Sequence, residues 1–244
     1  MDDGICVIVA AMNAEDTVAR AVASALAERE VAEVVVIDDA SRYASAAADR
    51  NAHASAGRQN QNCSRVNLGP AAARNLALAR SSAPLVAVLD ADDAILPGRF
   101  AALADPQGDW DMSADNIIFV APEQAAGIAG LSAFATGGTA ERMSFARFVA
   151  ANISQPDRPR GELGFLKPVM RRAFLQRHGL AYDPAMRLGE DFDLYARMLL
   201  AGARFRLVAA CGYVALERPD SLSAKHAAAD LAALVAADER MLAG

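Results

Sequence analysis

Residues 85–93 have the sequence Leu-Val-Ala-Val-Leu-Asp-Ala-Asp-Asp, an apolar run that stops at three carboxylates. An uninterrupted apolar run of this length is typical of a β-strand that is covered on both faces of a sheet. Carboxylate oxygens are hard ligands, and Asp-x-Asp spacing allows them to hold Mg²⁺ or Mn²⁺ while phosphate oxygens complete the coordination shell. The alternative is a solvated acidic turn that caps the next helix.

Two earlier segments have the same strand-like character. Ile5–Ala11 is continuously apolar, and Glu33–Ile37 is rich in β-branched residues and stops at Asp38-Asp39. Helical patterns at 13–27 and 70–81 separate the strands. This alternation predicts an α/β fold with an open, mostly parallel (mixed) sheet flanked by helices. Such sheets bind ligands beyond the carboxyl ends of their strands, where both acidic clusters lie.

The pattern weakens after residue 105, without an internal repeat or a linker that would force a second domain. Further strands are predicted at 63–66, 116–120 and 164–170, further helices at 143–151, 171–178 and 190–201, and a mobile loop at 124–140.

Composition limits the classes of function. The chain has 244 residues, of which 54% are hydrophobic, and this supplies a large core. A net charge of -6 argues against nucleic acid as the main partner. The three cysteines form no CxxC pair, as expected in a reducing compartment. Because no signal peptide or transmembrane pattern is present, we expect a cytoplasmic location.

Three other segments carry polar groups suited to ligand binding. Asp38-Asp39-Ala40-Ser41 can accept hydrogen bonds from a nucleoside base or ribose. In 67–75, Gly69 allows close approach of the backbone and Arg74 can face a nucleotide, although an ordinary helix start has the same features. Gly189-Glu190-Asp191 opens a helix, where its carboxylates could complement the helix dipole or act as a general base.

Taken in order, these segments resemble the family 2 glycosyltransferases of the GT-A fold. The matching residues are Val-Ile-Val-Ala-Ala-Met-Asn (7–13), Val-Ile-Asp-Asp-Ala-Ser (36–41), Asn-Leu-Gly-Pro-Ala-Ala-Ala-Arg-Asn (67–75), Leu-Asp-Ala-Asp-Asp (89–93) and Glu-Asp (190–191). Segments 161–172 and 182–184 further resemble the glucosyltransferases of rhizobial succinoglycan-type exopolysaccharide assembly.

The resemblance implies one GT-A domain over 1–244, with a nucleotide-sugar-binding half (1–104) and an acceptor-binding, catalytic-base half (105–244). It implies an inverting enzyme that moves a sugar, glucose by the narrower match, from a UDP-sugar donor to a glycan acceptor carried on a lipid. Processive members carry Gln-x-x-Arg-Trp and membrane helices, which this sequence lacks, so a single addition is expected.

The resemblance also implies roles for individual residues. Asp39 would contact the uracil, with Asn13, Gly69 and Arg74 nearby, and Asp191 would take the proton from the acceptor hydroxyl. Asp92 would reach the ribose or the metal, and Asp93 or Asp90 would help to hold the Mg²⁺ or Mn²⁺ ion at the diphosphate. Arg218, with Ser221 and Ser223, matches a pattern near the diphosphate; a surface turn is the alternative.

Segment 141–178 is basic although the whole chain is acidic. It holds eight basic residues against three acidic ones: Arg142, Arg147, Arg158, Arg160, Lys167, Arg171, Arg172 and Arg177 against Glu141, Asp157 and Glu162. A basic surface here could meet anionic lipid headgroups or a lipid-linked diphosphate. The hypothesis is peripheral contact with the inner face of the bacterial membrane; scattered solvated arginines are the alternative.

Three other functions share parts of the pattern. A receiver-type signalling domain has paired aspartates and a Lys-Pro such as Lys167-Pro168, but here the pair follows the second strand. A nucleotidyltransferase needs a glycine-rich basic loop after the first strand, and 10–15 is not one. A sugar-binding protein without activity would not require Asp191.

Overall fold

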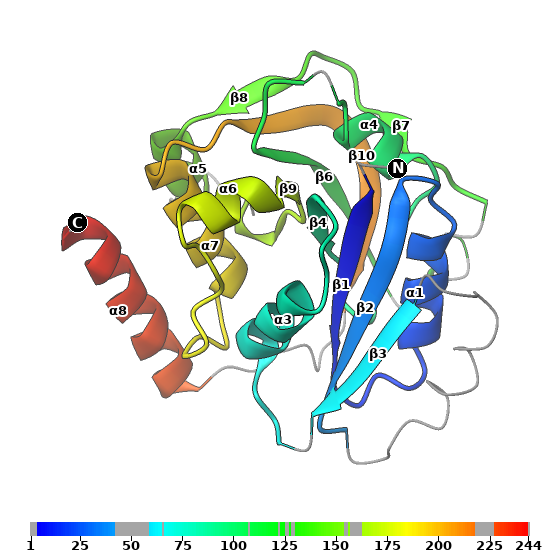
Figure 1. The fold of residues 1–244 in the computed structure, drawn as a ribbon. Coiled ribbons are helices and arrows are strands. Elements are labelled where there is room, and N and C mark those ends of the chain that lie inside the picture. The colour runs from blue at the N-terminus through cyan, green and yellow to red at the C-terminus, as the bar shows by residue number, and fades with distance from the viewer. Residues whose placement is uncertain are drawn as a thin grey trace.

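The computed structural model describes residues 4–41, 59–64, 66–106, 108–121, 123–124, 127, 130–153, 156, 163–217 and 227–243 (Figure 1). Its strands are β1 (Ile5–Ala11), β2 (Val31–Asp39), β3 (Gln59–Ser64), β4 (Leu85–Val88), β5 (Ala94–Ile95), β6 (Met112–Val120), β7 (Phe134–Ala135), β8 (Glu141–Met143), β9 (Val169–Arg171) and β10 (Phe205–Leu216). Its helices are α1 (Val18–Leu26), α3 (Pro70–Ala79), α4 (Arg99–Leu103), α5 (Phe145–Ala151), α6 (Arg172–Arg177), α7 (Glu190–Leu200) and α8 (Ala228–Ala243), with a 3-10 turn at Leu163–Phe165.

The described strands form one sheet in the order β3-β2-β1-β4-β9-β6-β10-β5, and β7 and β8 also pair with β10. The pairings β1–β2, β1–β4, β2–β3 and β6–β10 are parallel, whereas β9 runs antiparallel to both β4 and β6. All pairings that extend beyond three residues are among the parallel ones. The predicted α/β fold with a mixed, mostly parallel sheet is therefore confirmed.

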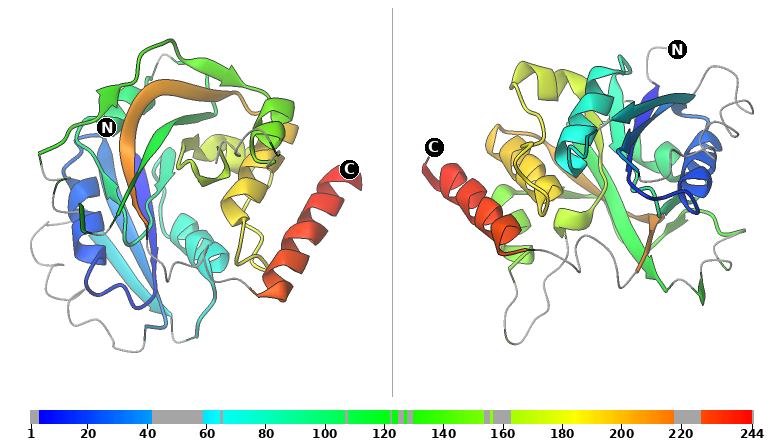
Figure 2. Two further views of the ribbon diagram at one scale, coloured as in Figure 1. Left: turned by 180° about the vertical axis from the view of Figure 1, so that it is seen from behind. Right: turned by 90° about the horizontal axis from the view of Figure 1, so that it is seen from below.

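Both faces of β1 are covered, which explains why its sequence is apolar throughout. Cys6 and Ile8 pack in one core cluster with alanines of α3, and Val7 and Val9 pack in the other with residues of α1. Successive side chains of a strand point to opposite faces, so α1 and α3 lie on opposite sides of the sheet (Figure 2). A strand in this position has no face on which polar residues are tolerated.

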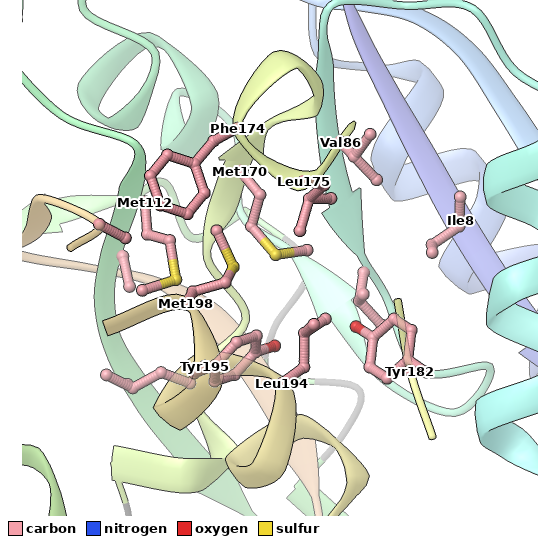
Figure 3. Packing of buried hydrophobic residues seen from close by; sticks show 14 of the residues in the cluster. Ile8, Val86, Met112, Met170, Phe174, Leu175, Tyr182, Leu194, Tyr195 and Met198 are labelled. Atoms are coloured by element: carbon pink, nitrogen blue, oxygen red, sulfur yellow. The ribbon is translucent and has the colours of Figure 1, made fainter. Parts of the chain in front are cut away.

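Methionines fill the space between the second half of the sheet and the helices that cover it. Figure 3 shows Met112, Met170 and Met198 meeting beside Phe174, with side chains from β6, β9, α7 and α6. All four side chains are buried. An unbranched thioether adapts to irregular gaps, so these methionines can fill the spaces between the short helices and strands of the second half.

Several predicted elements differ from those observed. Helix 13–27 begins only at Val18, strand 63–66 begins earlier at Gln59, and β6 starts at Met112. Segment 164–170 was expected to be one strand; instead a 3-10 turn is followed by β9, since Pro168 has no N–H to donate to a sheet. The short strand β7 lies within the segment predicted as a loop, and β10 and α8 were not predicted.

Several basic residues of the predicted basic surface on 141–178 are buried or paired, and membrane contact through it stays a prediction. Lys167 is buried, and Arg171 and Arg172 donate to the main-chain carbonyls of Trp110 and Ala83. Arg142 and Arg147 pair with Asp109 and Glu141. Arg158 and Arg160 lie outside the described residues. Within the described ranges, no helix is long and apolar enough to cross a membrane.

A buried ion pair fastens the start of α4 to β6 beneath β10. Nε and Nη2 of Arg99 both lie 2.9 Å from Oδ1 of Asp115, and both residues are 1% exposed. The pair crosses β10 at Gly212, where an added Cβ would lie 2.8 Å from Cβ of Arg99 and 3.0 Å from Oδ2 of Asp115. Only glycine leaves room for the pair.

We expect Gly212→Ala to lower the free energy of unfolding by about 1–3 kcal/mol, because its methyl group must displace a packed ion pair. Urea unfolding followed by circular dichroism measures this. Gly127→Ala is the matched control, because no atom of the described residues lies within 4 Å of its added Cβ. A Gly212→Ala variant as stable as the control would show that the crossing is not closely packed.

Candidate active site

Charged and polar side chains converge where β1, β2 and β4 end and where α3 and α7 begin. Asp39 is the last residue of β2, and Asp90 follows Leu89 just after β4. Arg74 lies one turn into α3, and Asp191 is the second residue of α7. This is the carboxyl edge of the parallel strands, where the sequence predicts the ligand site.

Two cations and two carboxylates form a closed ring at this edge. Arg74 Nη2 lies 2.8 Å from Asp90 Oδ1, and Arg74 Nη1 lies 3.2 Å from Asp191 Oδ1. Lys167 Nζ lies 2.9 Å from Asp90 Oδ2 and 2.6 Å from Asp191 Oδ2. Each cation thus bridges both carboxylates, an arrangement that we call the ion ring. Glu190 adds a third carboxylate, 2.5 Å from Arg74 Nη1.

Mutual pairing decides the charge states of the ring. Burial alone would raise the pKa of Asp90, but Lys167 and Arg74 lower it to about 2. Burial would lower the pKa of Lys167, yet Asp191 and Asp90 hold it above its usual value. Burial opposes the charge of Arg74 too, and its three carboxylate partners raise its pKa well above normal. Both bridging cations and Asp90 are therefore charged at neutral pH.

The ring is open to solvent on one side only. The side chain of Asp90 is 33% exposed, whereas those of Asp191, Lys167 and Arg74 are 9%, 6% and 6% exposed. Two buried tyrosines, Tyr182 and Tyr195, lie on the inner side in the core of Figure 3. Burial and then the charge of Asp191 raise their pKa values well above normal, so both remain neutral phenols. Asp90 is therefore the member of the ring that is most exposed to a ligand.

Asp93 faces the sheet. Its Oδ2 accepts a hydrogen bond of 2.7 Å from the Tyr213 hydroxyl, and its Oδ1 accepts one of 3.0 Å from the Leu216 N–H. Burial, and then the charges of Asp90 and Asp92, raise the pKa of Asp93 to about 7. The carboxylate thus ties the acidic turn to β10. Its predicted role as a metal ligand is untested and stays a prediction.

The acidic turn suits a cation that arrives with its phosphate ligands. Within the described residues, no three His, Cys, Asp or Glu side chains form a ready-made metal cage. Mg²⁺ usually takes one or two carboxylates from the protein and completes its shell with substrate phosphates and water. Asp92 lies half-buried between Asp90 and Asp93, and its main-chain carbonyl accepts 2.8 Å from Arg20 Nη2. The donor set fits such an ion with Asp92 as a ligand.

The carboxylate of Asp39 fixes the turn that leads into α3. Its Oδ1 accepts 2.6 Å from Leu68 N–H, and its Oδ2 accepts 2.8 Å from Gly69 N–H. Gly69 has φ of 85°, a left-handed conformation that favours glycine. One lone pair remains on each carboxylate oxygen, so Asp39 can still accept from a ligand. Arg187 crosses this turn and donates 2.7 Å to Oδ1 of Asn67.

Asn13 lies on the neighbouring loop. Its N–H donates 2.9 Å to Ser41 Oγ, and the Ser41 hydroxyl donates 2.6 Å to Oδ1 of Asp38. Asn13 and Ala40 have φ of 51° and 60°. Loops 12–14, 38–41 and 67–69, which we call the donor loops, thus form one side of the candidate site.

The structure places the predicted residues in two neighbouring groups. Asn13, Asp39 and Gly69 belong to the donor loops, and Arg74, Asp90 and Asp191 belong to the ion ring. Arg74 binds three carboxylates, and its expected contact with a nucleotide stays a prediction. Arg218, Ser221 and Ser223 lie outside the described residues.

Sequence reasoning gave no role in the site to Lys167 or Tyr213. Tyr213 carried no signal in the sequence. Lys167 did, because Lys167 and Lys225 are the only lysines among 24 basic residues.

Comparison with known proteins identifies the family. Residues 6–123 match the family described as Glycosyl transferase family 2. The succinoglycan biosynthesis protein ExoU of Rhizobium meliloti (strain 1021) is 52% identical over 241 residues, which cover 98% of this chain and 70% of ExoU. The chain belongs to glycosyl transferase family 2. The succinoglycan biosynthesis protein ExoO of the same organism is 32% identical over 246 residues, covering 96% of this chain and 67% of ExoO.

Solved structures share the fold. S. aureus TarS 1-349 in complex with UDP-GlcNAc has a TM-score of 0.65 at 20% identity, covering 92% of this chain and 62% of that one. GalNAc-T7 with UDP, GalNAc and Mn²⁺ has a TM-score of 0.70 at 17% identity, covering 97% of this chain and 47% of that one. The GT-A fold of this glycosyltransferase is thereby confirmed, and a receiver domain is excluded.

We expect the stability of this glycosyltransferase to depend on pH through Asp93. The folded pKa of about 7 lies above the ordinary 3.8, so the folded state binds the proton more tightly. Ionisation of Asp93 therefore costs stability as pH rises from about 4 to about 7. Asp93→Asn, which stays neutral, should gain stability relative to the unchanged protein over that range.

The measurement is urea unfolding of both proteins at pH 5 and pH 8 with EDTA present. The difference in unfolding free energy between Asp93→Asn and the unchanged protein should favour the variant more at pH 8. A difference that is equal at the two pH values would contradict a raised pKa. Asp105→Asn, at a half-buried carboxylate beside Arg206, is a control outside the site.

Proposed function

We propose that this protein is an inverting, non-processive glycosyltransferase that moves a sugar from a UDP-sugar to a hydroxyl of a glycan acceptor. One observation carries the proposal: Lys167 Nζ lies 2.9 Å from the solvent-facing Asp90 and 2.6 Å from the buried Asp191. A carboxylate suited to the donor and a carboxylate suited to base catalysis are thus within reach of one reacting centre.

The donor side is assigned to the donor loops. Asp39 and Asn13 would contact the uracil, since Asp39 keeps an acceptor lone pair on each oxygen and Gly69 brings the backbone close. Asp92 would reach the ribose or the metal, Asp90, the exposed member of the ion ring, would contact the nucleotide sugar, and Arg218 would contact the diphosphate. TarS with UDP and with UDP-GlcNAc supports a uridine nucleotide.

Asp191 is assigned the role of general base. Arg74 and Lys167 each occupy one of its oxygens, and a lone pair on either oxygen remains for a proton. As the acceptor oxygen forms its bond to the anomeric carbon, the bond from that carbon to the diphosphate oxygen breaks. The hydroxyl proton passes to Asp191, and a single displacement of this kind inverts the anomeric centre.

A divalent cation, Mg²⁺ or Mn²⁺, is proposed at Asp92, with Asp93 as a second candidate. When bound, such a cation offsets the charge that develops on the leaving nucleoside diphosphate. GalNAc-T7 with Mn²⁺ supports this cofactor by likeness of fold. Lys167 and Arg74 already offset the charge of the nearby Asp90, so Asp90 would compete little with Asp92 for the cation.

The relatives suggest the pathway. ExoU and ExoO are succinoglycan biosynthesis proteins, so we propose a role in bacterial exopolysaccharide synthesis, with glucose as donor sugar and a lipid-linked oligosaccharide as acceptor. Residues 1–104 would bind the nucleotide sugar and 105–244 the acceptor. We propose a cytoplasmic location, with contact at the inner face of the membrane made through the lipid-linked acceptor.

The base assignment predicts that Asp191→Asn lowers kcat by about 10²- to 10⁴-fold, because the amide cannot take the proton. UDP affinity, measured by calorimetry, should change by less than about threefold, since the donor loops are intact. Asp183→Asn, at a carboxylate paired with Arg240, is the matched control and should retain activity. An active Asp191→Asn enzyme would refute the role of Asp191.

The class of reaction is tested by release of nucleoside diphosphate from a panel of nucleotide sugars, with Mg²⁺, Mn²⁺ or EDTA. We expect turnover with a UDP-sugar and its loss with EDTA, and Asp92→Asn should raise the metal concentration needed for half-maximal rate about 10-fold or more. Full activity in EDTA would overturn the metal assignment. Absence of transfer from all donors to any glycan would overturn the proposed function.

A further inference from the structure

Lys167 is a buried cation held between two carboxylates of the site. Its ammonium nitrogen lies within 3 Å of carboxylate oxygens from two separate elements, the end of β4 and the start of α7. The residue is 5% exposed. An uncompensated ammonium at this depth is strongly disfavoured, so the position keeps a lysine only because both carboxylates are present.

The main chain of Lys167 is held as firmly as its side chain. Nη2 of Arg99 donates 2.6 Å to the Lys167 carbonyl, and the same guanidinium is paired with Asp115. The next residue, Pro168, restricts the backbone conformation of Lys167 to extended values. β9 follows at once and pairs with β4, the strand that carries Asp90. Lys167 therefore has little freedom to leave the ring.

The chemistry of the two basic side chains explains why the position carries lysine. Lysine is rare here, with two among 24 basic residues. Its ammonium is a compact point charge with three donors, whereas the guanidinium of arginine is a wider planar fork. Arg74 already spans the ring from one side with that fork. The small ammonium group of Lys167 fits the remaining gap between Asp90 and Asp191.

We propose that Lys167 is a positioning residue for sugar transfer, acting through Asp191. It fixes one oxygen of Asp191, so that the lone pairs left on that carboxylate point to the acceptor side. It also sets the separation of Asp191 from Asp90, and thereby from the donor. This inference rests on the proposed function, because it assumes that Asp191 is the base.

The test compares Lys167→Met, which keeps the length of the side chain and removes its charge, with Lys167→Arg. We expect Lys167→Met to lower kcat by about 10- to 100-fold, while the KM for the UDP-sugar changes by less than about threefold, since Arg74 still holds Asp90. Lys167→Arg should recover part of the lost kcat, because it restores the charge.

A double variant separates positioning from general damage. If Lys167 acts through Asp191, then Lys167→Met combined with Asp191→Asn should be no slower than Asp191→Asn alone, within about threefold. Multiplying losses in the double variant would overturn the proposal. So would Lys167→Met with an unchanged kcat, or with a rise in KM that accounts for the whole loss.

Arg172→Met is the matched control for stability. Arg172 is a half-buried cation five residues along the chain, and its Nε and Nη1 donate to the main-chain carbonyls of Ala83 and Leu78. It should cost stability without a selective loss of kcat. If the unchanged enzyme transfers no sugar, or if Asp191→Asn stays active, the proposed function fails; if Asp191→Asn is inactive and Lys167→Met is not, only the role of Lys167 fails.

Discussion

Burial of negative charge at the end of a sheet is the constraint on which this molecule depends. Parallel strands bring Asp39 and Asp90 to one edge, and the start of α7 adds Glu190 and Asp191. Carboxylates at this depth must be offset by cations or by N–H donors. The chain supplies Arg74 and Lys167 for the ring and the N–H groups of 68 and 69 for Asp39. The contacts that stabilise this part of the fold are therefore the same contacts that position the residues of the candidate site.

The second half of the chain supplies one cation and one carboxylate of the ion ring. Lys167 and Asp191 come from segments far along the sequence, and β9 brings the first of them beside β4 by antiparallel pairing. Arg99 reaches across to the carbonyl of Lys167 while it pairs with Asp115 of β6. Tyr213 and Leu216 of β10 fix Asp93. Elements of the second half thus help to hold Asp90 and Asp93 of the turn in place.

Local signals made much of this predictable. Strands β1, β2 and β4 are apolar runs that end at carboxylates or small residues, and both their existence and their shared edge followed from that pattern. β10 could not be predicted from local signals. It contains Gly212 and is half-exposed over 206–209, and it forms a strand because it pairs with β6, about 90 residues earlier. The partners of Asp93 and the position of Lys167 depend on the same distant pairings. Arg74 was expected at the site, but its carboxylate partners could be found only in three dimensions.

Helix α3 joins the donor loops to the ion ring without any flexible connection. Gly69 caps the helix and Arg74 lies one turn further on, so the helix fixes both the distance and the angle between them. Each residue of an α-helix advances the direction of its side chains by about 100°. An insertion or deletion of a single residue between positions 69 and 74 would swing the guanidinium away from all three carboxylates. Residues in this stretch can be substituted, but the number of residues between Gly69 and Arg74 is fixed by this geometry.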